Sequence, residues 1–306
     1  MPRGKSGNYR DIDGFLLLDK PAGLSSNQAL QRVRRIFRAR KAGHCGSLDP
    51  LATGLLPVCL GQATRFSGYL LGASKTYRAR CRLGETTTTG DAEGEVVERR
   101  PPTLASGQLQ RVLSAFVGRI EQVPPMHSAL KHQGRRLYQL AREGREVERA
   151  ARTVEIQRLE LLDCELPMIE IEVQCSKGTY IRSLAEDIGR ELGCGAHLAA
   201  LRRTEVDSMR VEDSLTLEDL QALAADDPQA LEATLMPPDA ALEGYPCIEL
   251  QAAAARDICH GKRVDLACEI LPGLYRLMAA DGDFIGLGEV RDGGELAAKR
   301  LMNTAG

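Results

Sequence analysis

One carboxylate, Asp49, lies in a segment that could present it to a ligand. Residues 43–54 have the sequence Gly-His-Cys-Gly-Ser-Leu-Asp-Pro-Leu-Ala-Thr-Gly. Glycine permits backbone shapes and close approaches that other residues resist, and Pro50 fixes φ directly after the carboxylate. An aspartate held in this way can act as a nucleophile or a base. The spacing alone favours a simple turn, because Asp-Pro among glycines is common turn chemistry.

Four further segments carry tyrosine, arginine or aspartate at short intervals. They are Ser-Lys-Thr-Tyr at 74–77, Gly-Glu-Thr-Thr-Thr-Thr-Gly-Asp-Ala-Glu-Gly at 84–94, Cys-Ser-Lys-Gly-Thr-Tyr-Ile-Arg-Ser-Leu at 175–184 and Leu-Arg-Arg-Thr at 201–204. Taken singly, either tyrosine, Tyr77 or Tyr180, would more often be a core residue, and Arg182 would be a surface residue. Their order along one chain is what makes them informative.

Together with the Asp49 segment, these motifs resemble those of TruB-type pseudouridine synthases, which modify the uridine at position 55 in the T arm of tRNA. The resemblance extends from about Gly14 to at least Thr204. It implies the pseudouridine synthase fold, an α+β architecture with a mixed, mainly antiparallel sheet and a central catalytic cleft. It also implies that this chain isomerises that uridine of tRNA to pseudouridine. Cys45 and Ser47 stand where threonine is frequent in relatives, which leaves the hydrogen bonding of the loop open.

The resemblance also assigns a role to each of these residues. Asp49 is expected to be the catalytic carboxylate, with Arg182 as its catalytic ion-pair partner and Tyr77 as the catalytic tyrosine beside the base. The other expected roles are substrate contact for Tyr77, Tyr180, Leu201 and His44, and support of the site for Asp91, Lys20 and Lys131. His44 is expected next to the flipped nucleotide, where its ring could fill the gap left in the base stack.

The chemistry of the resembled reaction accounts for these residue types. The N1–C1′ bond breaks, the base turns, and C5 joins C1′ without net redox change, so neither a cofactor nor a metal is expected. Asp49 could attack the sugar, add to the base or take a sugar proton, and the sequence leaves these routes open. A guanidinium such as Arg182 within about 4–6 Å is expected to lower the pKa of Asp49 by about 1–3 units. Tyr77 could stack on the flipped uracil or help to remove the proton from C5.

Length and composition agree with an enzyme of one large and one small domain. The chain has 306 residues, no run of about 18 apolar residues, and an N-terminus without the apolar core of a secretory signal, so a cytoplasmic location is expected. Nine cysteines, an odd number, include no Cys-x-x-Cys pair and no cluster with the five histidines. Reduced thiols are therefore expected, with neither a zinc site nor a disulfide scaffold.

The charge is unevenly distributed, although the net charge is only −2. Residues 1–41 carry ten Lys or Arg against three acids, and residues 131–152 carry seven against three. Residues 205–245 carry one Arg against eleven acids. Each cluster alone would be an ordinary solvated face, but together with the motifs the two basic regions predict contact with RNA phosphates. The expected partner is tRNA, bound by a monomer that has no implied protein partner and no contact with a membrane.

The hydrophobic pattern predicts the elements that position Asp49. Residues 14–20 are typical of a short apolar strand, closed by Pro-Ala-Gly. Ser26 or Asn27 could cap the following helix, which has an apolar face and a strongly basic opposite face. Residues 169–175 alternate apolar and polar side chains and predict a half-buried strand. Thr179 could cap a helix to about residue 192, which would place Tyr180 and Arg182 in its first turn.

Two regions are predicted to extend the catalytic domain, which spans residues 1–245. Residues 124–152 form a basic excursion with a short helix near 137–140, and the family has a thumb-like RNA-binding insertion at this place; on charge alone a surface hairpin is equally compatible. Residues 246–306 contain short strands around a turn at 281–283. They are compatible with a small β-rich domain similar to the RNA-binding PUA module.

Two other functions are compatible with parts of the sequence. A protein that binds or folds tRNA could use the same scaffold and basic surface without depending on catalysis, and it would be indifferent to Asp49. A glycoside-cleaving enzyme commonly needs two carboxylates beside the bond, and Asp91 is the only second candidate. The joint presence of Asp49, Tyr77 and Arg182 favours the synthase over both.

Overall fold

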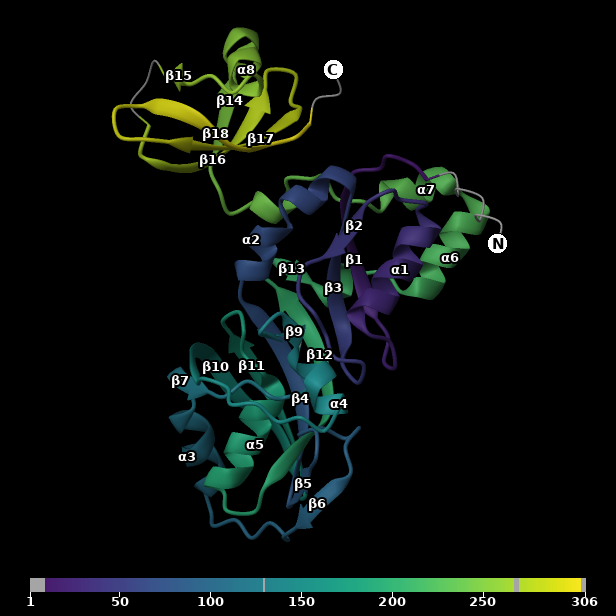
Figure 1. Ribbon diagram of the computed structural model, residues 1–306, viewed down its shortest axis with the longest axis vertical. Coiled ribbons are helices and arrows are strands. Elements are labelled where there is room, and N and C mark those ends of the chain that lie inside the picture. Colours follow the sequence, from purple (N-terminus) through teal and green to yellow (C-terminus); the bar gives the residue numbers. More distant parts are fainter. Residues whose placement is uncertain (1–8, 129, 267–269, 304–306) are drawn as a thin grey trace.

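The computed structural model describes residues 9–128, 130–266 and 270–303. Its main sheet runs through the length of the larger part of the molecule (Figure 1). The strand order is β1 (Gly14–Lys20), β3 (Thr53–Leu60), β12 (Ala196–Val206), β4 (Lys75–Leu83), β11 (Met168–Cys175), β10 (Arg152–Glu165) and β7 (Gly118–Gln122), with β2 (Ala42–His44) on β3 and β13 (Met209–Arg210) on β12. Only the β3–β12 pairing is parallel, so the prediction of a mixed, mainly antiparallel sheet is confirmed.

Helices cover the two halves of this sheet separately. At the β1 end, α1 (Ser26–Ile36) and α6 (Leu217–Asp226) lie side by side, and at the other end α5 (Ile181–Glu191) and α3 (Gln108–Ala115) pack on β12 and β10 (Figure 1). The shorter elements are β5 (Glu85–Thr87), β6 (Val96–Arg99), β8 (Lys131–His132), β9 (Arg135–Arg136), α2 (Ser67–Gly72), α4 (Leu137–Arg142), α7 (Pro228–Ala233), and the 3-10 turns η1 (Gly61–Arg65), η2 (Val211–Asp213) and η3 (Ala240–Leu242). In the described part of the chain, no helix is long and apolar enough to cross a membrane.

A second, five-stranded sheet lies at one end of the molecule (Figure 1). Its order is β14 (Cys247–Leu250), β16 (Gly273–Ala279), β17 (Phe284–Val290), β18 (Glu295–Leu301) and β15 (Val264–Asp265), with α8 (Ala252–Cys259) beside it. The short strands predicted after residue 246 are therefore confirmed. Edge-to-face ring contacts join this sheet region to α2 and its surroundings, with 5.2 Å between the ring centroids of Phe66 and Phe284.

The sequence pattern predicted the strands more accurately than the helix starts. β1 spans the predicted residues, and Ile169 and Ile171 of β11 are buried as the alternation requires. The cap of α1 is Ser25, whose side chain accepts from the Gln28 amide, so the prediction of Ser26 or Asn27 is wrong by one or two residues. The reason is that the Ser26 hydroxyl is buried and bonds elsewhere.

The predicted cap of α5 is also wrong. The helix begins at Ile181, and Tyr180 occupies the N-cap position without a side-chain capping bond. The Thr179 hydroxyl instead donates to the Ser176 carbonyl at 2.9 Å, which uses it in the turn after β11. Arg182 remains in the first turn of the helix, as predicted.

Gly54 shows how tightly the Asp49 segment is held against β12. Its φ is +97°, and a Cβ at this position would lie 2.2 Å from the carbonyl oxygen of Arg203. We therefore expect Gly54→Ala to lower the free energy of unfolding by about 2–4 kcal/mol, from backbone strain and displacement of β12. Urea unfolding followed by circular dichroism measures this change.

The matched control for Gly54 is Gly68 in α2, where a Cβ would meet nothing within 4 Å. Gly68→Ala is expected to leave the stability unchanged or to raise it by up to about 1 kcal/mol, since alanine favours a helix. Equal unfolding midpoints for Gly54→Ala and the parent protein would show that the close approach to β12 is not required.

Candidate active site

Asp49 lies on a loop between β2 and β3 whose backbone is fixed on both sides. The Ser26 hydroxyl accepts from the Leu48 amide at 2.7 Å and donates to the Leu48 carbonyl at 3.0 Å. On the other side, the Gly23 amide donates to the Pro50 carbonyl at 2.8 Å. The carboxylate therefore projects from a backbone that the first turn of α1 and the residues before it hold in place.

Lys20 supports the turn that contacts the Asp49 loop. It is fully buried, and its ammonium donates to the carbonyls of Pro21 at 2.8 Å and Leu24 at 2.7 Å. These bonds shape the turn that carries Gly23. Burial lowers the pKa of Lys20 to about 8, and the nearby Asp49 carboxylate opposes this shift.

Asp49 forms an ion pair with Arg182, with 2.9 Å between Oδ2 and Nε. The Arg182 side chain is 4% exposed, whereas that of Asp49 is 43% exposed. Asp91 lies behind the guanidinium, 3.6 Å from Nε and 5% exposed. Two backbone carbonyls, of Thr89 at 3.2 Å and His127 at 2.6 Å, accept from the other nitrogens of Arg182. The guanidinium is thus held in place by several bonds and directs its Nε–H at the Asp49 carboxylate.

The pKa of Asp49 differs from the prediction made from the sequence. Arg182 lowers it, as expected, but burial raises it more, and the Asp91 carboxylate adds to the rise. The net pKa lies above the ordinary value, so the predicted downward shift is wrong. Burial and Asp91 thus disfavour the ionised form of Asp49, and Arg182 is the main group that stabilises it.

Five of the predicted site residues line one cavity of about 350 Å³. They are Asp49, Tyr77, Tyr180, Arg182 and Leu201. The loop after β2, strands β4 and β12, and the start of α5 supply them, so segments far apart in the sequence meet at the centre of the main sheet. This size and mixture of apolar walls with a few polar groups is typical of a small-ligand site.

The two tyrosines are held in different ways. Tyr77 on β4 is 9% exposed, and burial raises the pKa of its hydroxyl. Tyr180 is fixed through its backbone, because the Gln122 side chain accepts from its amide at 3.0 Å and donates to its carbonyl at 3.3 Å. Both rings can therefore offer a fixed surface to a planar ligand.

Four predicted site residues lie outside the cavity lining: Lys20 and Asp91, already described, and His44 and Lys131. His44 is half-buried on β2, and burial lowers the pKa of its ring, with the charges of Arg203 and Arg136 adding to the effect. Its buried Nδ1 has no hydrogen-bond partner among the described residues. Lys131 is exposed on β8. The structure does not bring either side chain to Asp49.

Three buried polar residues of the cavity lining were not predicted as site residues. Lys75, Ser128 and Arg203 line it, and the side chains of Lys75 and Arg203 are buried. The Lys75 ammonium donates to the carbonyls at the end of α2, at 3.0 Å from Leu70. Arg203 could have been found, because it stands two residues after Leu201 and so shares its face of a strand. Among the described residues, no cluster of His, Cys, Asp or Glu could hold a metal ion.

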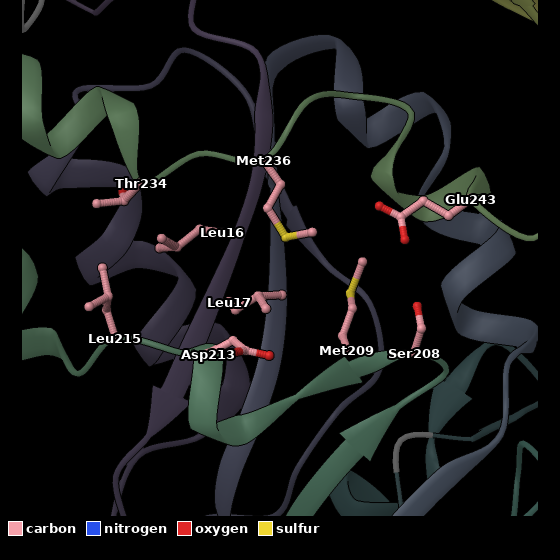
Figure 2. A pocket seen from close by; sticks show the side chains of 9 residues that line it. All are labelled: Leu16, Leu17, Ser208, Met209, Asp213, Leu215, Thr234, Met236 and Glu243. Carbon is pink, nitrogen blue, oxygen red and sulfur yellow. The ribbon is translucent and has the colours of Figure 1, made fainter.

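A second cavity, of about 370 Å³, contains none of these residues. Figure 2 shows Met209, Met236 and Leu17 facing the same space, with the carboxylates of Asp213 and Glu243 at its border. It lies between β1, β13 and the segment before η3, away from the Asp49 loop. The predicted catalytic residues Asp49, Tyr77 and Arg182 line the first cavity and not this one.

The fold and the site together define a pseudouridine synthase. Three family models match the chain in succession: the TruB family pseudouridylate synthase N-terminal domain at residues 34–181, the tRNA pseudouridylate synthase B C-terminal domain at 182–243, and the pseudouridine synthase II TruB C-terminal domain at 246–302. The chain belongs to the TruB family of pseudouridine synthases. It is an isomerase that converts uridine to pseudouridine.

Relatives and solved structures agree with this membership. The tRNA pseudouridine synthase B of Chromohalobacter salexigens is 54% identical over 96% of this chain and 95% of its own length. That of Pseudomonas aeruginosa is 51% identical over 96% and 97%. A solved H/ACA RNP bound to a substrate RNA containing 2′-deoxyuridine matches with a TM-score of 0.72 and 26% identity, covering 95% of this chain and 85% of the other.

Proposed function

We propose that this enzyme isomerises the uridine at position 55 in the T arm of tRNA and that Asp49 is the carboxylate that engages the flipped nucleotide. One observation carries the proposal: Asp49 is the only acid among the described residues of the cavity lining, and it is paired with the buried Arg182. The curated relatives that are named tRNA pseudouridine synthase B support tRNA as the substrate.

The same observation argues against glycoside cleavage with two carboxylates. Asp91 is buried behind Arg182 and does not line the cavity, so it cannot flank a bond opposite Asp49. Its oxygen accepts from the Glu93 amide at 3.1 Å and from the Thr89 hydroxyl. We assign Asp91 to orienting the guanidinium of Arg182.

The remaining residues of the cavity fit a flipped uridine. The ring of Tyr180 or Tyr77 can stack on the base, and Leu201 forms an apolar wall beside it. The Tyr77 hydroxyl is a candidate for taking the proton from C5 at the end of the reaction. Sugar attack, addition to the base and removal of a sugar proton all remain open to Asp49, because each requires only that the carboxylate be ionised.

Residues 124–152 are proposed to act as a thumb that closes on the RNA. Ser128 and Leu130 line the cavity, and the His127 carbonyl accepts from Arg182, so this segment already borders the site. Beyond it, the β8–β9 hairpin presents Lys131 and Arg136 to solvent. The positive charge of Arg136 contributes to the lowered pKa of His44. We propose that His44 lies beside the flipped nucleotide in the complex.

The other parts of the chain are proposed to extend the RNA surface. Residues 1–245 form the catalytic domain, and residues 246–306 form a PUA-like RNA-binding domain around the second sheet. On α1, Leu30 and Val33 are buried while Arg32 and Arg35 face solvent, as the basic face requires. We propose a monomer, and a tRNA substrate supports the cytoplasm as its location.

Replacing Lys131 and Arg136 together by glutamine is expected to weaken tRNA binding and its dependence on salt. If each contacts one phosphate, the slope of log K against log [KCl] should become shallower by about 0.7–0.9 per lost contact. Fluorescence anisotropy with labelled tRNA over a series of KCl concentrations gives this slope. Arg210→Gln is the control, because Arg210 is 67% exposed within the acidic region. An unchanged slope in the double variant would remove this hairpin from the RNA interface.

Tritium release from tRNA labelled at uridine C5 tests the proposed function. Release is expected from tRNA with uridine at position 55 and not from tRNA with cytidine there and label elsewhere. Release from both would place the modified uridine at another position. Tight binding without release would leave a protein that binds or folds tRNA.

A further inference from the structure

Arg203 lies directly opposite Tyr77 where β12 pairs with β4. Directly opposed residues of an antiparallel pair project on the same face with their Cβ atoms about 4.5–5.5 Å apart. The Arg203 side chain is 1% exposed and lines the same cavity as the tyrosine. Its Nε donates to the Leu55 carbonyl at 2.7 Å and one terminal nitrogen donates to the Gly46 carbonyl at 3.2 Å. The guanidinium is therefore fixed beside the Tyr77 hydroxyl.

This guanidinium has no carboxylate partner among the described residues. The neighbouring Arg202 projects on the other face and makes a bidentate ion pair with Asp19, at 3.0 and 2.7 Å. Arg203 bonds two neutral carbonyls, and a side-chain hydrogen bond links it to the Tyr77 hydroxyl. A buried cation without an anion is costly, and its field acts on every group around it. It opposes protonation of Lys75 and His44 and is not neutralised by either.

The group best placed to supply the missing negative charge is the Tyr77 oxygen. Burial raises the pKa of this hydroxyl, and Arg203 is the strongest influence in the opposite direction. No other tyrosine described here faces a buried, unpaired guanidinium across a strand pair. The two residues thus form a cation and a latent anion on the wall of the cavity, next to the loop that carries Asp49.

We propose that Arg203 is a positioning residue that holds the Tyr77 oxygen toward the base and stabilises the phenolate form of Tyr77, which then takes the proton from C5. The inference rests on the proposed role of Tyr77. In this step the phenolate oxygen gains the C5 proton, the C–H electron pair forms the C5=C6 bond, and the C6=N1 pair moves to N1, which takes a proton from water. Tyr77 then returns its proton to solvent. No electron or atom is left over, because the base loses one proton at C5 and gains one at N1.

Single-turnover kinetics on tRNA carrying hydrogen or deuterium at uridine C5 test this step. Arg203→Gln removes the charge, and Arg203→Lys keeps it. We expect Arg203→Gln to slow product formation by about 10²-fold or more, within the range of general acid–base effects, and to make deuterated tRNA react more slowly than the protonated form. Arg203→Lys should recover part of the rate and reduce the isotope effect, and it carries the test if the glutamine variant does not fold.

Two further variants separate this role from anchoring of the loop through Gly46. Arg202→Gln, on the other face, should show no isotope effect whatever its rate. In a Tyr77→Phe background, Arg203→Gln should add little further loss, because the group that it serves is gone. Equal slowing of both tRNAs, with full additivity in the double variant, would reduce Arg203 to a loop anchor. A Tyr77→Phe enzyme with the parental rate and no isotope effect would instead remove Tyr77 as the base, and with it the inference.

Discussion

Asp49→Asn is expected to lower the rate of pseudouridine formation by on the order of 10⁴-fold or more, because it removes the only described acid of the cavity lining. The amide has nearly the shape of the carboxylate but can neither attack the sugar nor take a proton. Tritium release under single-turnover conditions gives the rate, and anisotropy gives tRNA affinity. Binding should stay within about threefold of the parent protein, since the phosphate contacts are unchanged.

The stability of the Asp49→Asn variant can also be predicted. The pKa of Asp49 is raised on folding, chiefly by burial. A carboxyl group whose pKa is raised on folding stabilises the fold at pH values below its unfolded pKa. This contribution is lost as the pH rises through its pKa in the folded protein. Above the folded pKa the ionised carboxylate therefore opposes folding, and the neutral amide should unfold there at the same temperature or higher. A lower unfolding temperature would contradict this account.

Glu93 supplies a matched control for the lost carboxylate. Its side chain is mostly exposed. Partial burial, followed by the charges of Asp91 and Asp49, raises its pKa, so Glu93 lies in the same electrostatic surroundings as Asp49. Glu93→Gln should keep the rate within about threefold, as an exposed surface substitution usually does. A loss as deep as that of Asp49→Asn would mean that general negative charge, not one positioned oxygen, sustains the reaction.

Arg182→Met is expected to have the second largest effect. It leaves Asp49 and Asp91 facing each other without a cation and leaves the carbonyls of Thr89 and His127 without a donor. Breaking a buried ion pair in this way lowers stability by about 3–5 kcal/mol. The rate on the folded enzyme should fall by about 10²–10³-fold, the range found when one positioned donor is lost from a charged site.

The pH dependence of Arg182→Met shows the electrostatic part of this effect. Arg182 is the main group that opposes the rise in the pKa of Asp49, so its removal raises that pKa further. Since the carboxylate must be ionised, the decline of activity toward low pH should begin at a higher pH than in the parent enzyme. With Arg182→Lys, the decline should begin at a pH between those of Arg182→Met and the parent enzyme. Lysine keeps the positive charge but lacks the planar set of donors of arginine.

Arg190 on the same helix is the control for Arg182. Its side chain is 72% exposed and pairs with Asp187 one turn earlier, whose side chain is half-buried. Arg190→Met should change the rate and the unfolding temperature little, because exposed ion pairs contribute at most about 1 kcal/mol. If both arginine variants gave the same pH profile, the shift in Arg182→Met could not be assigned to the ion pair with Asp49.

Much of the fold could be predicted because it depends on local pattern. The period-two alternation of β11 and the apolar run of β1 specify their burial without knowledge of their partners. The caps of α1 and α5 could not be predicted, because Ser26 is engaged by Leu48 and Thr179 by a turn. Such competing bonds arise only when the segments have met.

The site was predictable in composition but not in its energetics. The motifs identified Asp49, Tyr77 and Arg182, and the cavity brings these three together. The sign of the pKa shift of Asp49 was missed, since it depends on how much water distant segments exclude from the loop. That Arg203 has no carboxylate partner among the described residues could not be predicted for the same reason, because it depends on how far the acidic side chains lie from it in the fold.

Charge shows a further limit of reasoning from segments. From the sequence, residues 205–245 are known only to carry an excess of acids. In the structure α6 packs beside α1, and Glu232 pairs with Arg10. Part of the acidic charge of this region therefore pairs with basic side chains of the protein itself. The basic surface that is left for a partner lies elsewhere and includes the β8–β9 hairpin.

The order of strands in the main sheet has a consequence for how the enzyme comes into being. β12 lies between β3 and β4, yet it is made after all the other strands of the sheet except its own hairpin partner β13. Until it is synthesised, β1 to β3 and β4 to β11 are two pieces that no strand joins. Leu201 and Arg203 are on that joining strand, so the ribosome must translate about two-thirds of the chain before any cavity exists. A nascent or truncated chain can thus hold Asp49 and Arg182 and still be unable to modify RNA.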